Sequence, residues 1–96
     1  MADYYVNIVA NKDRRVLYIG VTNNLRRRMA EHKNHALSGF TARYNVEYLI
    51  YFEHYTNPKD AIFREKQLKA GSRAAKIRLV RKKNPKLDEL DIDDKR

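Results

Sequence analysis

The amino-acid sequence predicts a single α+β domain whose strands and helices follow the order ββαβαα. Three short runs are rich in β-branched and aromatic residues, which favour strands. Three other segments begin at residues that cap helices, the usual sign of a helix start. A chain of 96 residues has room for one domain, and a chain of this size buries roughly 60–65% of its unfolded surface. We expect the domain to span residues 1–90 and a frayed acidic tail to follow at residues 91–96.

Three segments are predicted to be strands. Tyr4–Ala10 (YYVNIVA) and Arg15–Gly20 (RVLYIG) are separated by a polar turn at residues 11–14, so they are expected to form an antiparallel hairpin. The third strand is expected at Val46–Tyr55 (VEYLIYFEHY), where apolar and polar residues partly alternate.

The first predicted helix follows the hairpin. Thr22 or Asn23 can cap it, and apolar residues four apart indicate that it runs to about His35. The next stretch, residues 36–45, contains a Ser-Gly pair and is expected to be a connection over the surface.

Two further helices are predicted after the third strand. The Asn-Pro pair at residues 57–58 is a helix-start signal, and that helix should run to about Ala70, where Gly71 breaks it. Ser72 then caps a last helix that ends at about Lys83, shortly before a proline.

The charge of the chain is unevenly distributed. Lys and Arg number 21 and Asp and Glu 12, which gives a net charge of +9. Residues 1–85 hold 18 basic and 7 acidic side chains, whereas residues 86–96 carry a net charge of −2. A folded body this basic favours a polyanionic partner, most often nucleic acid. The alternative at this point is that the charge serves only solubility or non-specific attraction.

Several classes of protein are excluded by what the sequence lacks. It has no cysteine, which removes a disulfide framework, Cys-ligated zinc and thiol catalysis. No apolar stretch approaches the roughly 18 residues of a membrane span, and the first residues do not resemble a secretory signal. We therefore expect no membrane partner and a cytoplasmic location.

One group of residues has the side chains that catalysis on a phosphate requires. Tyr18 and Gly20 end the second predicted strand, and a run of three arginines follows one helix turn later. Arginine is the planar, permanently charged donor that suits a phosphate. Arg28 and His32 are four residues apart and share a helix face. Glu65 is one of few acids in a basic neighbourhood, and a hard divalent cation can use one carboxylate together with water and phosphate.

These residues are part of a sequence pattern that extends over most of the chain. The chain resembles small stand-alone bacterial members of the GIY-YIG nuclease superfamily, in the right order from residue 4 to about residue 90. The matching stretches are LYIGVTNNLRRRMAEHK (Leu17–Lys33), GFTARYN (Gly39–Asn45), YFEHYTNPKDAIFREKQLK (Tyr51–Lys69) and KIRLVRKKNP (Lys76–Pro85).

The resemblance implies a fold, a reaction and a set of catalytic residues. The implied fold is a three-stranded antiparallel sheet flanked by helices, and the implied activity is an endonuclease that hydrolyses DNA phosphodiester bonds with one Mg²⁺ or Mn²⁺ ion. By motif position, Tyr18 is the YIG tyrosine and Arg28 the family arginine. Glu65 corresponds to the metal ligand, His32 to a position near the scissile phosphate and Asn84 to a late catalytic asparagine.

Five further residues are predicted to contact nucleic acid. They are polar or basic and lie near the predicted site: Thr22, Arg26, Arg27, Arg43 and Lys69. Each also has a structural interpretation. The arginines can form a solvated helix face, Arg43 can pack in a loop, and Lys69 can pair with Glu65 four residues away. Asn84 can equally be a helix C-terminal residue before a proline.

The sequence departs from the family pattern at one position. Asn7 stands where the first half of the motif has a tyrosine, and an amide cannot become a phenolate. If that phenol orients or deprotonates water, the rate falls, since general-base contributions are typically ~10²–10⁴-fold. The alternative function is therefore a weakened or inactive nucleic-acid-binding module on the same fold.

The expected partner is DNA, including branched or damaged DNA, with RNA as the alternative. Family members often take specificity from an attached DNA-binding domain, and 96 residues leave no room for one. We therefore expect that the protein forms a homodimer or that a separate protein partner provides specificity.

Overall fold

The computed structural model describes residues 2–37 and 39–92. Its strands and helices follow the order ββααβαα along the chain. They are β1 (Tyr4–Ala10), β2 (Leu17–Thr22), α1 (Leu25–Lys33), α2 (Gly39–Arg43), β3 (Tyr48–Tyr55), α3 (Pro58–Ala70) and α4 (Arg73–Lys83). Within the described residues, no helix is long and apolar enough to cross a membrane.

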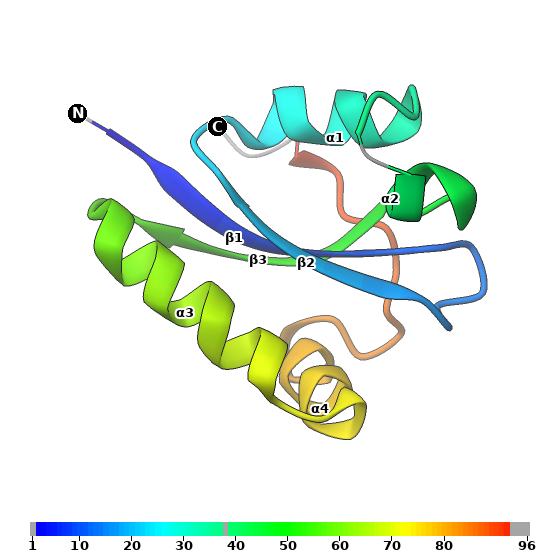
Figure 1. Cartoon of the computed structure of the whole chain (residues 1–96). Helices are drawn as coiled ribbons and strands as arrows, with labels where there is room; N and C mark the ends of the chain where they lie inside the picture. The colour runs from blue at the N-terminus through cyan, green and yellow to red at the C-terminus, as the bar shows by residue number, and fades with distance from the viewer. Residues whose placement is uncertain (1, 38, 93–96) are drawn as a thin grey trace.

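The three strands form one antiparallel sheet in the order β2-β1-β3 (Figure 1). The central strand β1 places Asn7 opposite Gly20 of β2 and Phe52 of β3. A register shift lies between Ile8 and Val9 where β1 meets β3. The predicted α+β class and antiparallel sheet are therefore confirmed.

Helices cover both faces of the sheet (Figure 1). On one face, α3 and α4 bury Ala61, Leu68 and Val80 in a first apolar cluster with Val6 and Ile8 of β1. On the other, α1 packs Leu25 and Met29 against Val9, Val46 and Leu49 in a second cluster. Because side chains alternate along a strand, neighbouring β1 residues enter different clusters.

The helix starts follow the predicted capping chemistry, with one change. The Asn57 side chain accepts from the Lys59 N–H at 2.8 Å and the Ser72 side chain from Ala75 at 3.0 Å. At α1, however, the cap is Asn24, which accepts from Arg27 N–H at 3.0 Å. The predicted caps, Thr22 and Asn23, lie before it because β2 extends two residues beyond Gly20.

The prediction of a loop at residues 36–45 was wrong. Gly39–Arg43 forms the short helix α2, which buries Thr41 and continues into a bond from Val46 N–H to Thr41 O of 2.9 Å. A helix of five residues is too short to show a 3.6-residue periodicity, and the Ser-Gly pair in the sequence at its start is typical of a loop.

The packed part of the chain also extends beyond residue 90. Leu90 N–H donates to Leu49 O at 2.8 Å, so the segment after α4 runs against β3. Ile92 then packs on the second cluster. The acidic tail expected at residues 91–96 therefore begins with packed residues, and residues 93–96 lie outside the described part of the chain.

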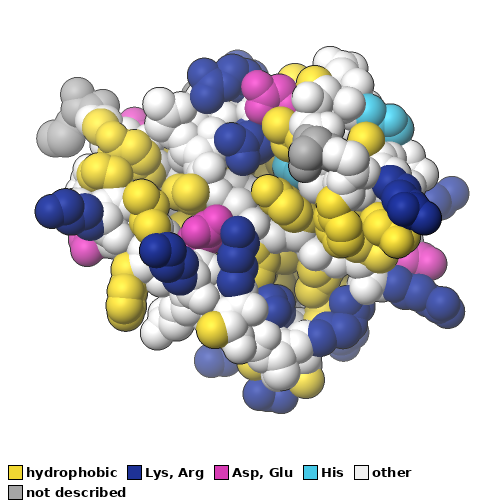
Figure 2. Space-filling model, viewed as in Figure 1, with side chains coloured by type: hydrophobic (Ala, Val, Ile, Leu, Met, Phe, Trp, Pro, Cys, Tyr) yellow, Lys and Arg dark blue, Asp and Glu magenta, His cyan; other side chains and the backbone are white. Residues whose placement is uncertain are grey.

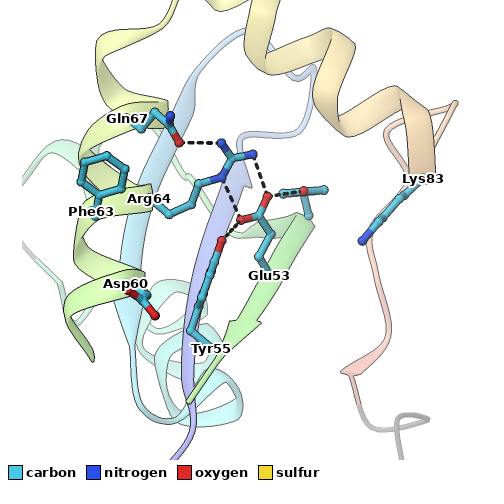
Figure 3. A pocket seen from close by; sticks show the side chains of 8 residues that line it. Glu53, Tyr55, Asp60, Phe63, Arg64, Gln67 and Lys83 are labelled. Atoms are coloured by element: carbon cyan, nitrogen blue, oxygen red, sulfur yellow. Dashed lines mark hydrogen bonds and ion pairs between the residues drawn. The ribbon is translucent and has the colours of Figure 1, made fainter. Parts of the chain in front are cut away.

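A polar network sits on the face covered by α3 (Figure 3). The Arg64 guanidinium donates to both Glu53 oxygens, from Nε at 2.9 Å and Nη2 at 3.0 Å. The Tyr51 and Tyr55 hydroxyls donate to the same carboxylate at 2.5 and 2.7 Å. Burial alone would raise the pKa of Glu53, but the hydrogen bonds from Arg64 and the two tyrosines outweigh it and lower the pKa to about 2.

This network makes stability depend on pH in acid. Because the folded pKa of Glu53 lies below its ordinary value of 4.5, its contribution is complete above pH about 4.5 and is lost as the pH falls toward 2. The free energy of unfolding of the native protein should fall by roughly 3 kcal/mol more than that of Glu53→Gln over this range. Urea denaturation at several pH values measures the difference, and parallel curves for the two proteins would contradict it.

Candidate active site

The candidate active site is centred on Gly20, near the end of β2. A Cβ atom on Gly20 would lie 3.2 Å from Tyr18 Cε2, 3.5 Å from Arg28 Nη1 and 3.6 Å from Asn7 Oδ1. Groups from β2, α1 and β1 therefore converge on one point, and the absence of a side chain at Gly20 leaves room for that approach. Three of the predicted catalytic residues are brought together here.

Arg28 reaches this point because of how α1 is anchored. The buried residues of α1 are Leu25, Met29 and His32, spaced four and three residues apart, so they form the inner face of the helix. Arg28 lies at the margin of that face, and its Nε donates to Glu31 Oε1 at 3.2 Å. The carboxylate steadies the guanidinium while Nη1 stays beside Gly20. Glu31 was not predicted for the site, although its spacing of three residues from Arg28 is a signal for it.

His32 lies behind Tyr18. Its side chain is 1% exposed, and its ring meets the Tyr18 ring edge-on with centroids 5.8 Å apart. Among the described residues neither ring nitrogen has a hydrogen-bond partner. Burial lowers the pKa of His32 and outweighs the opposing effect of the Val46 backbone, and the nearby positive charge of Arg28 lowers the pKa further. The ring is therefore neutral at pH 7.

Asn7 is fully buried at the centre of the sheet. It is 0% exposed, and neither its amide nitrogen nor its oxygen has a hydrogen-bond partner among the described residues. An unsatisfied buried polar group costs about 1–3 kcal/mol. Its oxygen faces the space over Gly20, so a water or a ligand at that point would satisfy it.

Glu65 lies on α3, on the other side of the sheet from α1. Its side chain is 15% exposed, and Oε2 pairs with Lys69 Nζ at 3.0 Å, the structural partner that the spacing predicted. Oε1 accepts no hydrogen bond among the described residues. Glu65 is thus a partly enclosed carboxylate with one oxygen available.

A surface hollow connects α3 with the Arg28 side of the site. It lies at the end of β2, with Arg27 and Arg28 on one side and Pro58 and Ile62 of α3 on the other. Ile62 precedes Glu65 by three residues, which places both on one side of the helix. The site therefore extends around the free edge of β2, from α1 to α3.

The set does not include Asn84. This residue is the C-cap of α4, and its amide nitrogen donates to Ile50 O at 2.9 Å and to Asp88 O at 2.8 Å. Its oxygen accepts from Asp88 N–H at 3.1 Å. These hydrogen bonds occupy the amide and hold the chain after α4 against β3. Asn84 therefore has the structural role, at the C-terminal end of a helix, that the sequence also allowed.

The predicted nucleic-acid contacts differ in accessibility. Thr22 is buried and its hydroxyl accepts from Asn24 N–H at 3.1 Å, so it shapes the turn into α1 instead of facing a partner. Arg27 is exposed and bonded to Asn23 at 3.1 Å. Arg26 is exposed beside it, Lys69 is held by Glu65, and Arg43 lies over the Tyr44 ring at 5.6 Å.

Comparison with known proteins identifies the family of this chain. Residues 3–78 match the family model of the GIY-YIG catalytic domain. The chain belongs to the GIY-YIG family. Its relatives include a UPF0213 protein of Clostridium perfringens, 37% identical over 82 residues, which cover 85% of this chain and 87% of the relative. Another, from Natronomonas pharaonis, is 37% identical over 79 residues, covering 82% and 92%.

A solved structure from the same group is similar in fold. The solution NMR structure of a UPF0213 protein from Bacillus halodurans superposes with a TM-score of 0.57 at 26% identity, covering 88% of each chain. The GIY-YIG domain is in general that of a nuclease family. Among the described residues, no group of three His, Asp or Glu side chains could hold a metal ion.

The capping role of Asn84 can be tested by removing its amide. Asn84→Ala should lower the free energy of unfolding by about 1–3 kcal/mol, because buried partners on β3 and residue 88 lose their bonds. Urea denaturation measures this, with the exposed Thr56→Ala as a control that should change little. A loss of activity per folded molecule without a loss of stability would restore a catalytic role.

The buried amide of Asn7 predicts an unusual gain in stability. Asn7→Leu should raise the free energy of unfolding by about 1 kcal/mol, because it replaces an unsatisfied amide with an apolar group of similar size. The midpoint of urea denaturation measures this change. A marked loss of stability would show instead that the amide is satisfied, for example by an ordered water.

Proposed function

We propose that this GIY-YIG protein is a divalent-metal-dependent endonuclease that hydrolyses phosphodiester bonds of DNA. The observation that carries the proposal is the convergence of Tyr18 and Arg28 over Gly20, in a chain that belongs to a nuclease family. A phenol and a guanidinium at one point are suited to a phosphate and an attacking water. The excess of basic residues supports a polyanionic substrate.

The residues present fit one hard divalent cation, Mg²⁺ or Mn²⁺, held mainly by the substrate and water. Glu65 supplies a single partly enclosed carboxylate with Oε1 available, and Mg²⁺ commonly binds through one or two carboxylates plus waters and phosphate. When bound, the cation polarises the phosphate and neutralises the leaving oxygen. Lys69, paired with Glu65 at 3.0 Å, holds the carboxylate until the cation is present.

The other side chains divide the remaining work. Arg28 donates to the reacting phosphate through Nη1 and stabilises its extra negative charge in the transition state. Tyr18 orients the attacking water or takes its proton through the phenolic oxygen. His32, neutral and buried beneath the Tyr18 ring, positions that ring and excludes water behind it.

One observation favours a second candidate function. Asn7 occupies a central, fully buried place beside Tyr18 and Arg28, where the family pattern has a tyrosine. Without that phenol the same surface can bind nucleic acid and cleave it slowly or not at all. A nucleic-acid-binding module on this fold is therefore the alternative to an efficient enzyme.

The metal role of Glu65 is tested with a matched pair of variants. Glu65→Gln should reduce cleavage of branched, nicked or linear DNA with Mg²⁺ or Mn²⁺ by at least ~100-fold, because it removes the proposed carboxylate ligand. Glu89→Gln is the control, since Glu89 also pairs with a lysine, Lys33 at 2.9 Å, outside the site. Cleavage by Glu65→Gln equal to that of the control would reject the metal role.

Restoring the missing phenol separates the two candidate functions. Asn7→Tyr should raise the cleavage rate by ~10²–10⁴-fold if a second phenol acts in general-base catalysis. Single-turnover cleavage measures the rate, and thermal denaturation checks that the larger side chain is accommodated. An unchanged rate in a folded variant would show that Asn7 is not what limits the reaction.

A further inference from the structure

A second surface, away from Gly20, carries a cluster of basic residues without ion-pair or hydrogen-bond partners among the described residues. Helix α4 contains no acidic residue. Among the described residues, five basic side chains in and after its second half make no ion pair or hydrogen bond, and all are exposed: Arg78, Arg81, Lys82, Lys83 and Lys86. By contrast, Arg27 and Arg28 near the candidate active site are held by Glu31.

Helix stability accounts for only part of this cluster, the three residues in the last turn of α4. Cations in the last turn interact favourably with the helix dipole, but Arg78 lies before the last turn. Arg78 and Lys82 are four residues apart on one face, and like charges at this spacing are destabilising. The lower part of Figure 2, where α4 lies, shows Lys and Arg side chains without acidic ones between them. A polyanion bound on this surface would relieve the repulsion.

A hollow lies next to the cluster, between α3 and α4. It has a volume of about 450 Å³, and Phe63 of α3 and Lys83 of α4 line it together with the Glu53–Arg64 network (Figure 3). Phe63 is 69% exposed, which leaves its ring free to stack. Lys83 Nζ lies 5.9 Å from the centroid of the Tyr51 ring and makes no other interaction among the described residues.

The floor of the hollow is rigid and cannot itself act as a cation site. Each Glu53 oxygen already accepts from Arg64 and from one tyrosine hydroxyl. Asp60 and Gln67 at the side of the hollow supply acceptor and donor groups at its rim. An exposed aromatic ring, polar groups around it and an adjacent row of cations together suit a nucleobase with its phosphates.

We propose that the α3–α4 surface is a second nucleic-acid contact, in which an unpaired base stacks on Phe63 and the neighbouring phosphates lie on Lys83 and the free cations of α4. The proposal rests on the proposed function, because it takes nucleic acid as the ligand. Phe63 and Lys83 do not line the hollow beside Arg28, so we assign them to binding and not to bond cleavage.

The test measures the binding of labelled oligonucleotides in EDTA, which removes divalent cations and so prevents the proposed cleavage. Phe63→Ala should weaken binding of a single-stranded 20-mer by ~10-fold and leave binding of a blunt duplex within ~2-fold, because only an unpaired base can stack. Lys83→Glu should weaken binding of both and reduce the salt slope. Lys12→Glu, on the β1–β2 turn, is the control with the same change in charge and should have a smaller effect.

The outcomes distinguish this proposal from the proposed function. Active cleavage by the native protein, with native binding by Phe63→Ala and Lys83→Glu, would overturn the second contact alone. Absence of cleavage, with binding that depends on both residues, would overturn the nuclease and support the contact. Equal losses for Lys83→Glu and Lys12→Glu would overturn it as general charge attraction. Phe63 and Lys83 are exposed, so both variants should fold. Far-ultraviolet circular dichroism checks this.

Discussion

The whole arrangement depends on the central strand β1, which is hydrogen-bonded on both edges and packed on both faces. Its pairing with β2 sets Asn7 opposite Gly20. Because side chains alternate along a strand, Asn7 faces α1 while Val6 and Ile8 enter the core under α3 and α4. A slip of one residue would send the apolar residues to the site and the amide to the other core. The same register therefore specifies the fold and assembles the candidate active site.

The two covered faces also explain why the site is formed at an edge. Arg28 comes from α1 on one face, and Glu65 comes from α3 on the other. Side chains on opposite faces cannot meet through a packed sheet, but they can meet around a strand with a free edge. The order β2-β1-β3 makes β2 such a strand, and the hollow at its end contains residues of both helices. An extended substrate could therefore reach the site from the side without opening the core.

The sequence predicted what depends on local chemistry, and the structure supplied what depends on distant contacts. Asn57-Pro58 and Ser72 determine helix starts through their own side chains, so those starts were predicted correctly. The capping of α4 by Asn84 involves Ile50, 34 residues away, which no local pattern indicates. The pair between Arg64 and Glu53 spans 11 residues and two elements, and it was likewise not predicted. For the site, Tyr18, Arg28 and Asn7 were identified by motif, but the burial of His32 and Thr22 required the packed helix.

The net charge of +9 serves different purposes at different places on the surface. Near Gly20 the basic residues are restrained, since Glu31 pairs with both Arg27 and Arg28. Restrained charges act at defined points, which is what stabilising one reacting phosphate requires. On α4 the basic residues lack such partners among the described residues, so their charges attract a polyanion over a broad surface and follow its backbone. The positive charge can thus be divided between positioning for chemistry near Gly20 and holding a substrate along α4.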